Sequence, residues 1–225
     1  MRKTGSLTER TKTWLHARHW VIAWAAIFLA ALIALAVTGQ IHIQGNGLPT
    51  WYELSVPLIA AAIWAVARFA FKTDLTEEYL LGIIFGVQWE FLTEPYWTYL
   101  PDRFNVLVWR TKDIPLLALP GWGTTFALAV LLTNWIGKEL FHLTPKQLVF
   151  DWRVLICDAI SIQLIGMGAE WTYGILLHCW DYEINFGLGK SPLGLGWEIH
   201  IGYMIVMFWY ATTMRVWKLK LEGSF

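Results

Sequence analysis

Residues 20–37, WVIAWAAIFLAALIALAV, decide the fold class because they form an apolar run without a single charged side chain. A helix of about 20 mostly apolar residues is long enough to cross the hydrocarbon layer of a bilayer. A basic and polar segment precedes the run, an arrangement that secretory signal peptides share. The run is long for a signal core, and we therefore expect it to be retained as a first membrane span.

The composition of the whole chain points the same way. Of its 225 residues, 56% are apolar and only 15% are charged, whereas soluble domains are usually about 25% charged. This length leaves room for one domain without a sizeable soluble module. The formal net charge is zero, so the total charge says nothing about nucleic acid. No nucleic-acid partner is expected for this membrane protein. The two cysteines predict neither a disulfide framework nor a Cys/His metal site.

Six segments are predicted to be spanning helices. Their approximate bounds are 20–38, 54–71, 79–97, 114–136, 154–177 and 193–214. The fold class is therefore predicted to be all-α, as a polytopic membrane bundle of about six helices. The expected organisation is a basic cytoplasmic segment at 1–19, one transmembrane domain at 20–217 and a short cytoplasmic tail at 218–225.

The distribution of basic residues predicts the orientation of the chain. The loops on the side opposite the N-terminus hold four of the 17 basic residues, namely Arg103, Arg110, Lys112 and Lys190. All others fall on the N-terminal side, which the positive-inside rule assigns to the cytoplasm. We thus expect cytoplasmic termini in a multi-pass protein of the cell membrane. The absence of an N-glycosylation acceptor site is compatible with a bacterial inner membrane.

Four glutamates interrupt the apolar segments. Glu90 and Glu94 lie one turn apart on the third helix, Glu170 lies in the fifth and Glu198 in the sixth. Helix geometry places all four in the outer half of the membrane. A carboxylate there costs at least a few kcal/mol and is a functional-site hypothesis by default. One carboxylic acid beside an ionised one is the usual arrangement for general acid/base catalysis, so these four are the predicted catalytic residues.

A structural role is the alternative for these acids, as helix-end caps or as partners of loop bases and indole N–H groups. Asp158, which lies in the inner half of the fifth helix, is predicted to reach the inner interface near Arg153. A role for Asp158 in a proton path is the other possibility.

Sixteen tryptophans are the second unusual feature of the chain. The aromatic belt at membrane interfaces explains many of them. Indole faces also stabilise cations, so aromatic side chains near the acids suit a carbocation intermediate or a cationic ligand. The predicted substrate-binding residues are Trp89, Trp97, Trp122, Trp171, Trp180, Trp197 and His200. The histidines lack the spacing of a metal or haem site, and no cofactor is predicted.

A weak internal repeat runs through the second half of the chain. Each unit has an acid, an outer aromatic pair and a Gly-Trp pair that opens the returning helix. The units comprise Glu90, Trp97, Tyr99 and Gly121-Trp122, and then Glu170, Trp180, Tyr182 and Gly196-Trp197. Both units are predicted to cross the membrane in the same direction, as duplicated units would. Chance similarity in a tryptophan-rich chain is the alternative.

The same residues resemble a known group of enzymes. Gln88-Trp89-Glu90-Phe91, and the run from Glu170 through Trp180-Asp181-Tyr182 and Pro192 to Gly194-Leu195-Gly196-Trp197-Glu198, resemble the acid-and-aromatic motifs of small integral-membrane terpenoid and carotenoid cyclases and hydratases. These include the lycopene-cyclase-domain proteins and the transmembrane terpene cyclases. The resemblance implies an enzyme that protonates an alkene or epoxide of a lipophilic, isoprenoid substrate. Glu90 would be the acid, with Glu170 or Glu198 as its partner.

Two functions of other classes stay open. The acids would form a proton- or cation-binding site in a small transporter or channel, or they would pair with another chain in a non-catalytic membrane subunit. A closed aromatic pocket favours the enzyme, a water-filled path to Asp158 favours transport, and carboxylates on a flat surface favour the subunit. The oligomeric state does not follow from the sequence.

Overall fold

The computed structural model describes residues 19–43, 46–93, 96–100, 102–104, 108–109, 114–144, 146–183 and 186–221, most of which are helical. The long helices are α2 (His19–Val37), α3 (Trp51–Ala65), α4 (Thr76–Thr93), α5 (Leu119–Glu139), α7 (Trp152–Glu170) and α8 (Trp197–Leu221). The π-helices η1 (Val66–Ala70) and η4 (Trp171–Leu176) continue α3 and α7, and the short helices are η3 (Leu116–Ala118) and α6 (Gln147–Phe150). This mostly helical structure agrees with the predicted all-α class.

Three helices are long and apolar enough to cross a membrane. They cover Trp51–Ala70, Leu116–Glu139 and Trp152–Leu176. A shorter apolar stretch, Ala25–Val37, lies within α2. These helices support the prediction of a membrane protein, because helices of this length and composition are rare outside bilayers.

Two predicted helices begin later in the structure than the sequence indicated. The fourth was expected to begin at residue 114, but Ile114–Pro115 forms strand β4 and α5 follows η3. The sixth was expected from residue 193, but a turn around Gly194, with φ of 83°, delays α8 to Trp197. Helix α8 also extends to Leu221, beyond the predicted end at residue 214.

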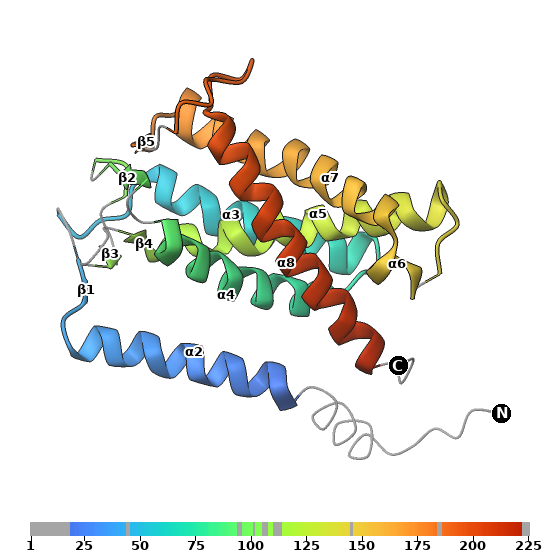
Figure 1. The fold of residues 1–225 in the computed structure, drawn as a ribbon. Coiled ribbons are helices and arrows are strands. Elements are labelled where there is room, and N and C mark those ends of the chain that lie inside the picture. Colours follow the sequence, from blue (N-terminus) through green and yellow to red (C-terminus); the bar gives the residue numbers. More distant parts are fainter. Residues whose placement is uncertain are drawn as a thin grey trace.

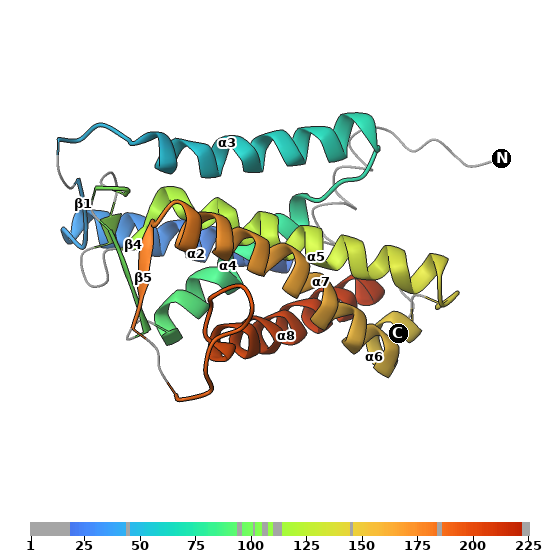
Figure 2. The ribbon, with the colours of Figure 1, turned by 90° about the horizontal axis from the view of Figure 1, so that it is seen from above.

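The long helices lie side by side and run alternately in opposite directions. Figures 1 and 2 show the strands gathered at one end of the bundle, with α6 and the last turn of α8 at the other. Helices α4, α5, α7 and α8 pack together, whereas α2 rests on α4 and α3 rests on α5. The connections that carry strands therefore lie together and form a cap, which we call the outer end.

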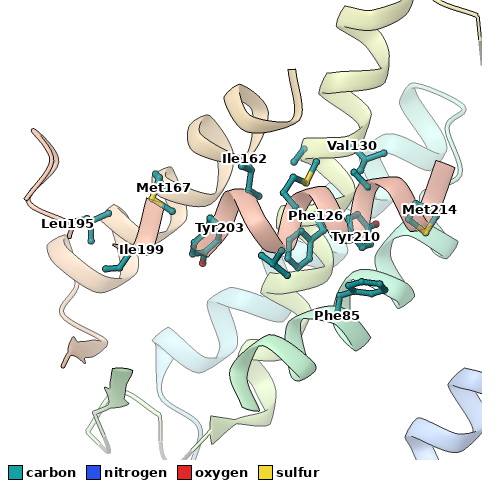
Figure 3. Close-up of a cluster of buried hydrophobic side chains, with 14 residues drawn as sticks. Phe85, Phe126, Val130, Ile162, Met167, Leu195, Ile199, Tyr203, Tyr210 and Met214 are labelled. Atoms are coloured by element: carbon teal, nitrogen blue, oxygen red, sulfur yellow. The ribbon is translucent and has the colours of Figure 1, made fainter. Parts of the chain in front are cut away.

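The core between α4, α5, α7 and α8 is aromatic and tightly filled. Phe85, Phe126, Tyr203 and Tyr210 are buried in it together with aliphatic residues and methionines (Figure 3). The rings of Phe126 and Tyr210 stack at 4.8 Å between centroids, a favourable aromatic geometry. Side chains of this cluster therefore fill the space between the four helices.

Small antiparallel sheets close the outer end. Strands β1 (Ile41–His42), β3 (Val108–Trp109) and β4 (Ile114–Pro115) form one sheet. Strands β2 (Trp97–Tyr99) and β5 (Trp180–Tyr182) form the other, with Trp97 opposite Tyr182 and Tyr99 opposite Trp180. Because β2 follows α4 and β5 follows α7, their pairing brings the ends of these two acid-bearing helices together.

A buried ion pair holds the inner half of the bundle and corrects the prediction for Asp158. Arg215 of α8 donates to both oxygens of Asp158 at 2.6 and 2.5 Å, and its Nε donates to Asn134 of α5 at 3.0 Å. Arg153, the expected neighbour, instead pairs with Asp151 at 2.7 Å. Asp158 is fully buried, so the bidentate arginine, and not the interface, is what compensates its charge.

Candidate functional site

Glu90 is held near the outer end of α4 by three aromatic side chains. The Tyr99 hydroxyl and the Trp122 indole donate to its Oε1 at 2.6 and 2.8 Å, and the Trp97 indole donates to its Oε2 at 3.0 Å. Only 2% of Glu90 is exposed. Burial, together with the charge of Glu90, raises the pKa of the Tyr99 phenol well above its usual range. The phenol therefore stays protonated and remains a donor.

Glu170 is held in the same way at the end of α7. Tyr203 of α8 donates to its Oε1, and Tyr182 of β5 donates to its Oε2. The Trp180 indole is shared between Glu170 Oε2 at 3.2 Å and the Tyr182 hydroxyl at 2.8 Å. Glu170 is 8% exposed, so both acids are buried. The donors described for them are uncharged phenols and the indole N–H groups that the structural alternative named.

The two acids are the centres of two similar half-sites. Each lies on a helix that runs to the outer end, is followed by a Trp-x-Tyr strand, and takes its third donor from the returning helix. The two third donors, Trp122 and Tyr203, stack on each other at 5.4 Å between ring centroids. The antiparallel pairing of β2 with β5 completes the likeness. The acid and the Trp-x-Tyr strand of each predicted repeat unit thus occupy like positions. Trp197, the predicted counterpart of Trp122, is exposed instead, and Tyr203 takes its place.

A glycine one turn before each acid makes room for its third donor. A Cβ at Gly86 would overlap the Trp122 ring, and a Cβ at Gly166 would lie 2.7 Å from the Tyr203 ring. Both glycines precede their acid by four residues and so lie on the same face of the helix as the acid. The Gly-x-x-x-Glu spacing is a further element of the repeat.

Both acids line a single cavity of about 100 Å³. Its walls are mostly aromatic, and its described lining includes no lysine, arginine or histidine. The aromatic lining residues are Trp97, Tyr99, Phe104, Trp122, Tyr173, Trp180 and Tyr203. The structure thus brings Glu90 and Glu170 from two helices to one cavity, together with Trp97, Trp122 and Trp180 from the predicted binding residues.

Glu198 lies elsewhere, and this corrects the expectation that it shares the cavity. Its Oε1 accepts hydrogen bonds from the backbone N–H groups of Phe186 at 2.8 Å and Leu188 at 3.4 Å. It therefore fixes the preceding loop to the first turn of α8, which is the structural alternative considered for it. Glu94 lies outside the described residues.

His200 also lies apart from the two acids. Its Nδ1 is 2.5 Å from Gln163 Oε1, and its Nε2 is 2.9 Å from Ser191 Oγ. The Gln163 amide in turn donates to the backbone carbonyl of His200 at 3.0 Å. This network links α7 to α8 and to the loop before α8, and none of its members lines the cavity.

The remaining predicted tryptophans do not line the cavity either. Trp89 packs against the core and lies over Gly202, where a Cβ would be 2.9 Å from its ring. Trp171 and Trp197 are 41% and 44% exposed. Each follows or precedes an acid by one residue, and helical neighbours point about 100° apart. Adjacency in sequence was therefore a poor guide to a shared cavity.

Sequence reasoning missed three tyrosines as site residues. Tyr99 and Tyr182 were visible as the second aromatic residue of each repeat unit, so the Trp-x-Tyr pattern was an available signal. Tyr203 lies in the middle of an aromatic helix, and only the rotation of α8 about its axis turns it toward Glu170. No pattern in the sequence marks it.

Within the described part of the chain, no group of three or more His, Cys, Asp and Glu side chains is placed to hold a metal ion. No family model, curated protein or solved structure matches the chain at a significant level. The paired carboxyls and their aromatic donors are therefore the basis for the functional proposal.

Proposed function

We propose that this protein is an integral membrane enzyme that acts on a lipophilic, isoprenoid substrate by carboxyl acid/base chemistry. The observation that carries the proposal is the convergence of Glu90 and Glu170 on one buried, aromatic cavity whose described lining is free of basic residues. Pairs of carboxyls in unlike surroundings commonly divide the roles of acid and base. The resemblance to membrane terpenoid and carotenoid cyclases and hydratases supports the same chemistry.

The proposed reaction needs only the two carboxyls and the aromatic walls. One carboxylic acid transfers its proton to an alkene carbon, which leaves a carbocation on the substrate and a carboxylate on the protein. The faces of Trp97, Trp122 and Trp180 stabilise the positive charge. The second carboxylate removes a proton from a neighbouring carbon, and the electrons of that C–H bond form the new double bond. Such a sequence requires no cofactor.

The size of the cavity limits what it accommodates. Ligand pockets usually measure about 300–1,000 Å³, whereas this cavity measures about 100 Å³. It suits the reacting end of a substrate, such as one terminal isoprene unit, with the remaining chain in the surrounding lipid. Val56 of α3 forms part of the wall, and α3 otherwise rests mainly on α5. A substrate chain would therefore leave the bundle beside α3.

The filled core favours this enzyme over a transporter. Phe126, Ile162 and Met207, all with 0–1% exposure, occupy the layer between the two acids and the Asp158–Arg215 pair. Both carboxylate oxygens of Asp158 accept hydrogen bonds from Arg215. A proton or cation path across the membrane would have to cross this packed layer and the Asp158–Arg215 pair. The two acids therefore lie at the end of a cavity and not along a channel.

The proposed topology is six spans with both termini in the cytoplasm of a bacterial cell. Support comes from the alternating helix directions, which put all strand-bearing connections at one end (Figure 1). The two connections at the opposite end are short and carry basic residues, as the positive-inside rule requires of cytoplasmic segments. The acids would then face the outer leaflet.

A comparison of lipids tests the proposal. Nonpolar lipids are extracted from cells of the source organism that carry the wild-type gene, a deletion, Glu90→Gln or Glu170→Gln, and are profiled by mass spectrometry. We expect one lipid class to be lost and its precursor to accumulate in the deletion and in both variants. Glu139→Gln, an exposed acid at the other end of α5, is the matched control and should match wild type. Identical profiles for wild type and deletion would overturn the proposal.

A further inference from the structure

The two half-sites differ in whether their donors can pass a proton on. An indole N–H only donates, whereas a phenol hydroxyl both donates and accepts. Glu90 has two indoles and one phenol as partners. Glu170 has two phenols and one indole. The described partners of Glu170 therefore include two groups that can pass a proton on.

A second cleft lies on the outer side of Glu170. It measures about 600 Å³, and Tyr182 and Trp180 form part of its wall. Glu170 lines the inner cavity and does not line this cleft, whereas Tyr182 lines the cleft and does not line the cavity. The hydrogen bond from Tyr182 to Glu170 therefore connects a residue of the cleft wall with a residue of the cavity wall.

The other two phenols do not reach the cleft. Tyr99 is 8% exposed and is covered by the rings of Phe104 and Trp180, each at 5.6 Å between centroids. Tyr203 is 5% exposed and lies within the helical core. Among the phenols bonded to the two acids, Tyr182 is the one in contact with the outer space.

We propose that Tyr182 is a proton-transfer residue that connects the outer cleft with Glu170. In this step the phenol gives its hydroxyl proton to the Glu170 carboxylate, and the phenol oxygen takes up a proton from a hydronium ion in the cleft, which leaves water. The inference deepens the proposed function, because it makes Glu170 the carboxyl of the pair that exchanges its proton with the outer cleft.

The backbone next to Glu170 is shaped for this contact. A Cβ at Gly174 would lie 2.5 Å from the Tyr182 hydroxyl and 2.8 Å from the Trp180 indole nitrogen. Gly174 lies within η4, the π-helical segment that starts directly after Glu170. π-helical turns are rare and occur often at functional sites. Any larger residue at Gly174 would push the phenol away from the carboxyl.

Titratable groups lie on both sides of the Tyr182–Glu170 hydrogen bond. The groups nearest to Tyr182 and Glu170 on the cavity side are Glu90, Tyr99 and Tyr203. The titratable groups that line the cleft are His178, Asp181, Glu183, Lys190 and Glu198. Burial, followed by the charge of Glu170, raises the pKa of the Tyr182 phenol well above its usual range. The phenol hence keeps a proton to transfer and does not rest as a phenolate.

Time-resolved infrared spectroscopy tests the relay without any substrate. The purified full chain in lipid nanodiscs is acidified rapidly, and the C=O band of protonated Glu170 is identified by its absence in Glu170→Gln. We expect Tyr182→Phe to slow the appearance of this band about tenfold or more. Tyr203→Phe, which also removes a phenol from Glu170 but does not face the cleft, should stay within about twofold of wild type.

A second variant guards against a folding defect in Tyr182→Phe. Gly174→Ala keeps every hydroxyl but displaces Tyr182, and it should slow the band as Tyr182→Phe does. Equal rates in wild type, Tyr182→Phe and Gly174→Ala would overturn the relay, as would equal slowing by Tyr182→Phe and Tyr203→Phe. Because the assay uses no substrate, its failure leaves the proposed reaction intact, and an unchanged lipid profile would leave this result intact.

Discussion

Three buried acids of this chain are compensated in two different ways. Asp158 is neutralised by the guanidinium of Arg215. Glu90 and Glu170 instead accept hydrogen bonds from neutral indoles and phenols. Neutral donors offset part of the cost of burying a carboxylate but do not cancel its charge. A cavity lined by such acids therefore attracts a proton or a cationic intermediate. The Asp158–Arg215 pair does not, because its charges neutralise each other.

The first prediction concerns the acceptors that Glu90 provides. Glu90→Gln keeps the shape but replaces one acceptor oxygen by an NH₂ group, which then faces the indole of Trp97 or the donors on Oε1. An unsatisfied buried donor costs about 1–3 kcal/mol. We expect a lower midpoint of thermal unfolding in detergent, with no change for the exposed Glu139→Gln. A variant as stable as wild type would contradict the hydrogen bonds assigned to Glu90.

Helix contacts at the site depend on residues that have no side chain. In the Glu170 half-site, Gly166 faces Tyr203, whereas Gly168 of the same helix has nothing within 4 Å of a built Cβ. The first glycine therefore positions a donor, and the second serves no packing role in the described chain. Small residues of this kind commonly let membrane helices approach closely.

These two glycines give a matched pair of variants for the second prediction. Gly166→Ala would place a methyl group 2.7 Å from the Tyr203 ring, and overpacking of a core costs about 1–3 kcal/mol. Gly168→Ala should be neutral or stabilising by up to about 1 kcal/mol, since alanine favours the helix. Unfolding midpoints of the two variants in detergent measure the contrast. Equal midpoints would show that Tyr203 does not pack on Gly166.

The buried ion pair between Asp158 of α7 and Arg215 of α8 gives the third prediction. Asp158→Asn leaves the buried charge of Arg215 without its partner, and breaking a buried pair costs about 3–5 kcal/mol. The double variant Asp158→Leu with Arg215→Met removes both charges and should recover most of that loss. Chemical unfolding of the three proteins tests this. A single variant as stable as wild type would mean that water or other groups solvate Arg215.

The start of α7 gives the fourth prediction, which concerns pH. Asp151 caps this helix by accepting from the backbone N–H of Arg153 at 2.9 Å, and hydrogen bonds from the Arg153 side chain and backbone lower the pKa of its carboxyl to about 2. A depressed pKa adds stability that is complete above the unfolded-state pKa of about 3.9 and is lost as pH falls toward 2. The stability difference between wild type and Asp151→Asn should thus shrink between pH 5 and pH 2. A constant difference would exclude the ion pair.

At the scale of the whole molecule, the sequence predicts where the long helices lie, because this depends on the length of the apolar runs. It predicts few side-chain contacts between helices, because these depend on how each helix is rotated about its axis. The long apolar helices, such as Trp51–Ala70 and Trp152–Leu176, follow from runs of apolar residues. Glu90 and Glu170 were found because acids are rare in such runs. The roles of Tyr203 and Arg215 were not, because each depends on which face of α8 meets α7.

The orientation of the whole bundle is the last prediction, and it decides from which side protons reach Glu170. Lys190 lies in the strand-bearing connection before α8, and Lys138 lies near the far end of α5; both are exposed. In intact cells a membrane-impermeant maleimide should label Lys190→Cys and should label Lys138→Cys only after permeabilisation. The two native cysteines are free but buried, so the parent chain serves as the unlabelled control. Labelling of Lys138→Cys alone from outside would place the cleft beside Tyr182 on the cytoplasmic side and reverse the direction of proton uptake. Labelling of both variants from outside would contradict a bundle that spans the membrane.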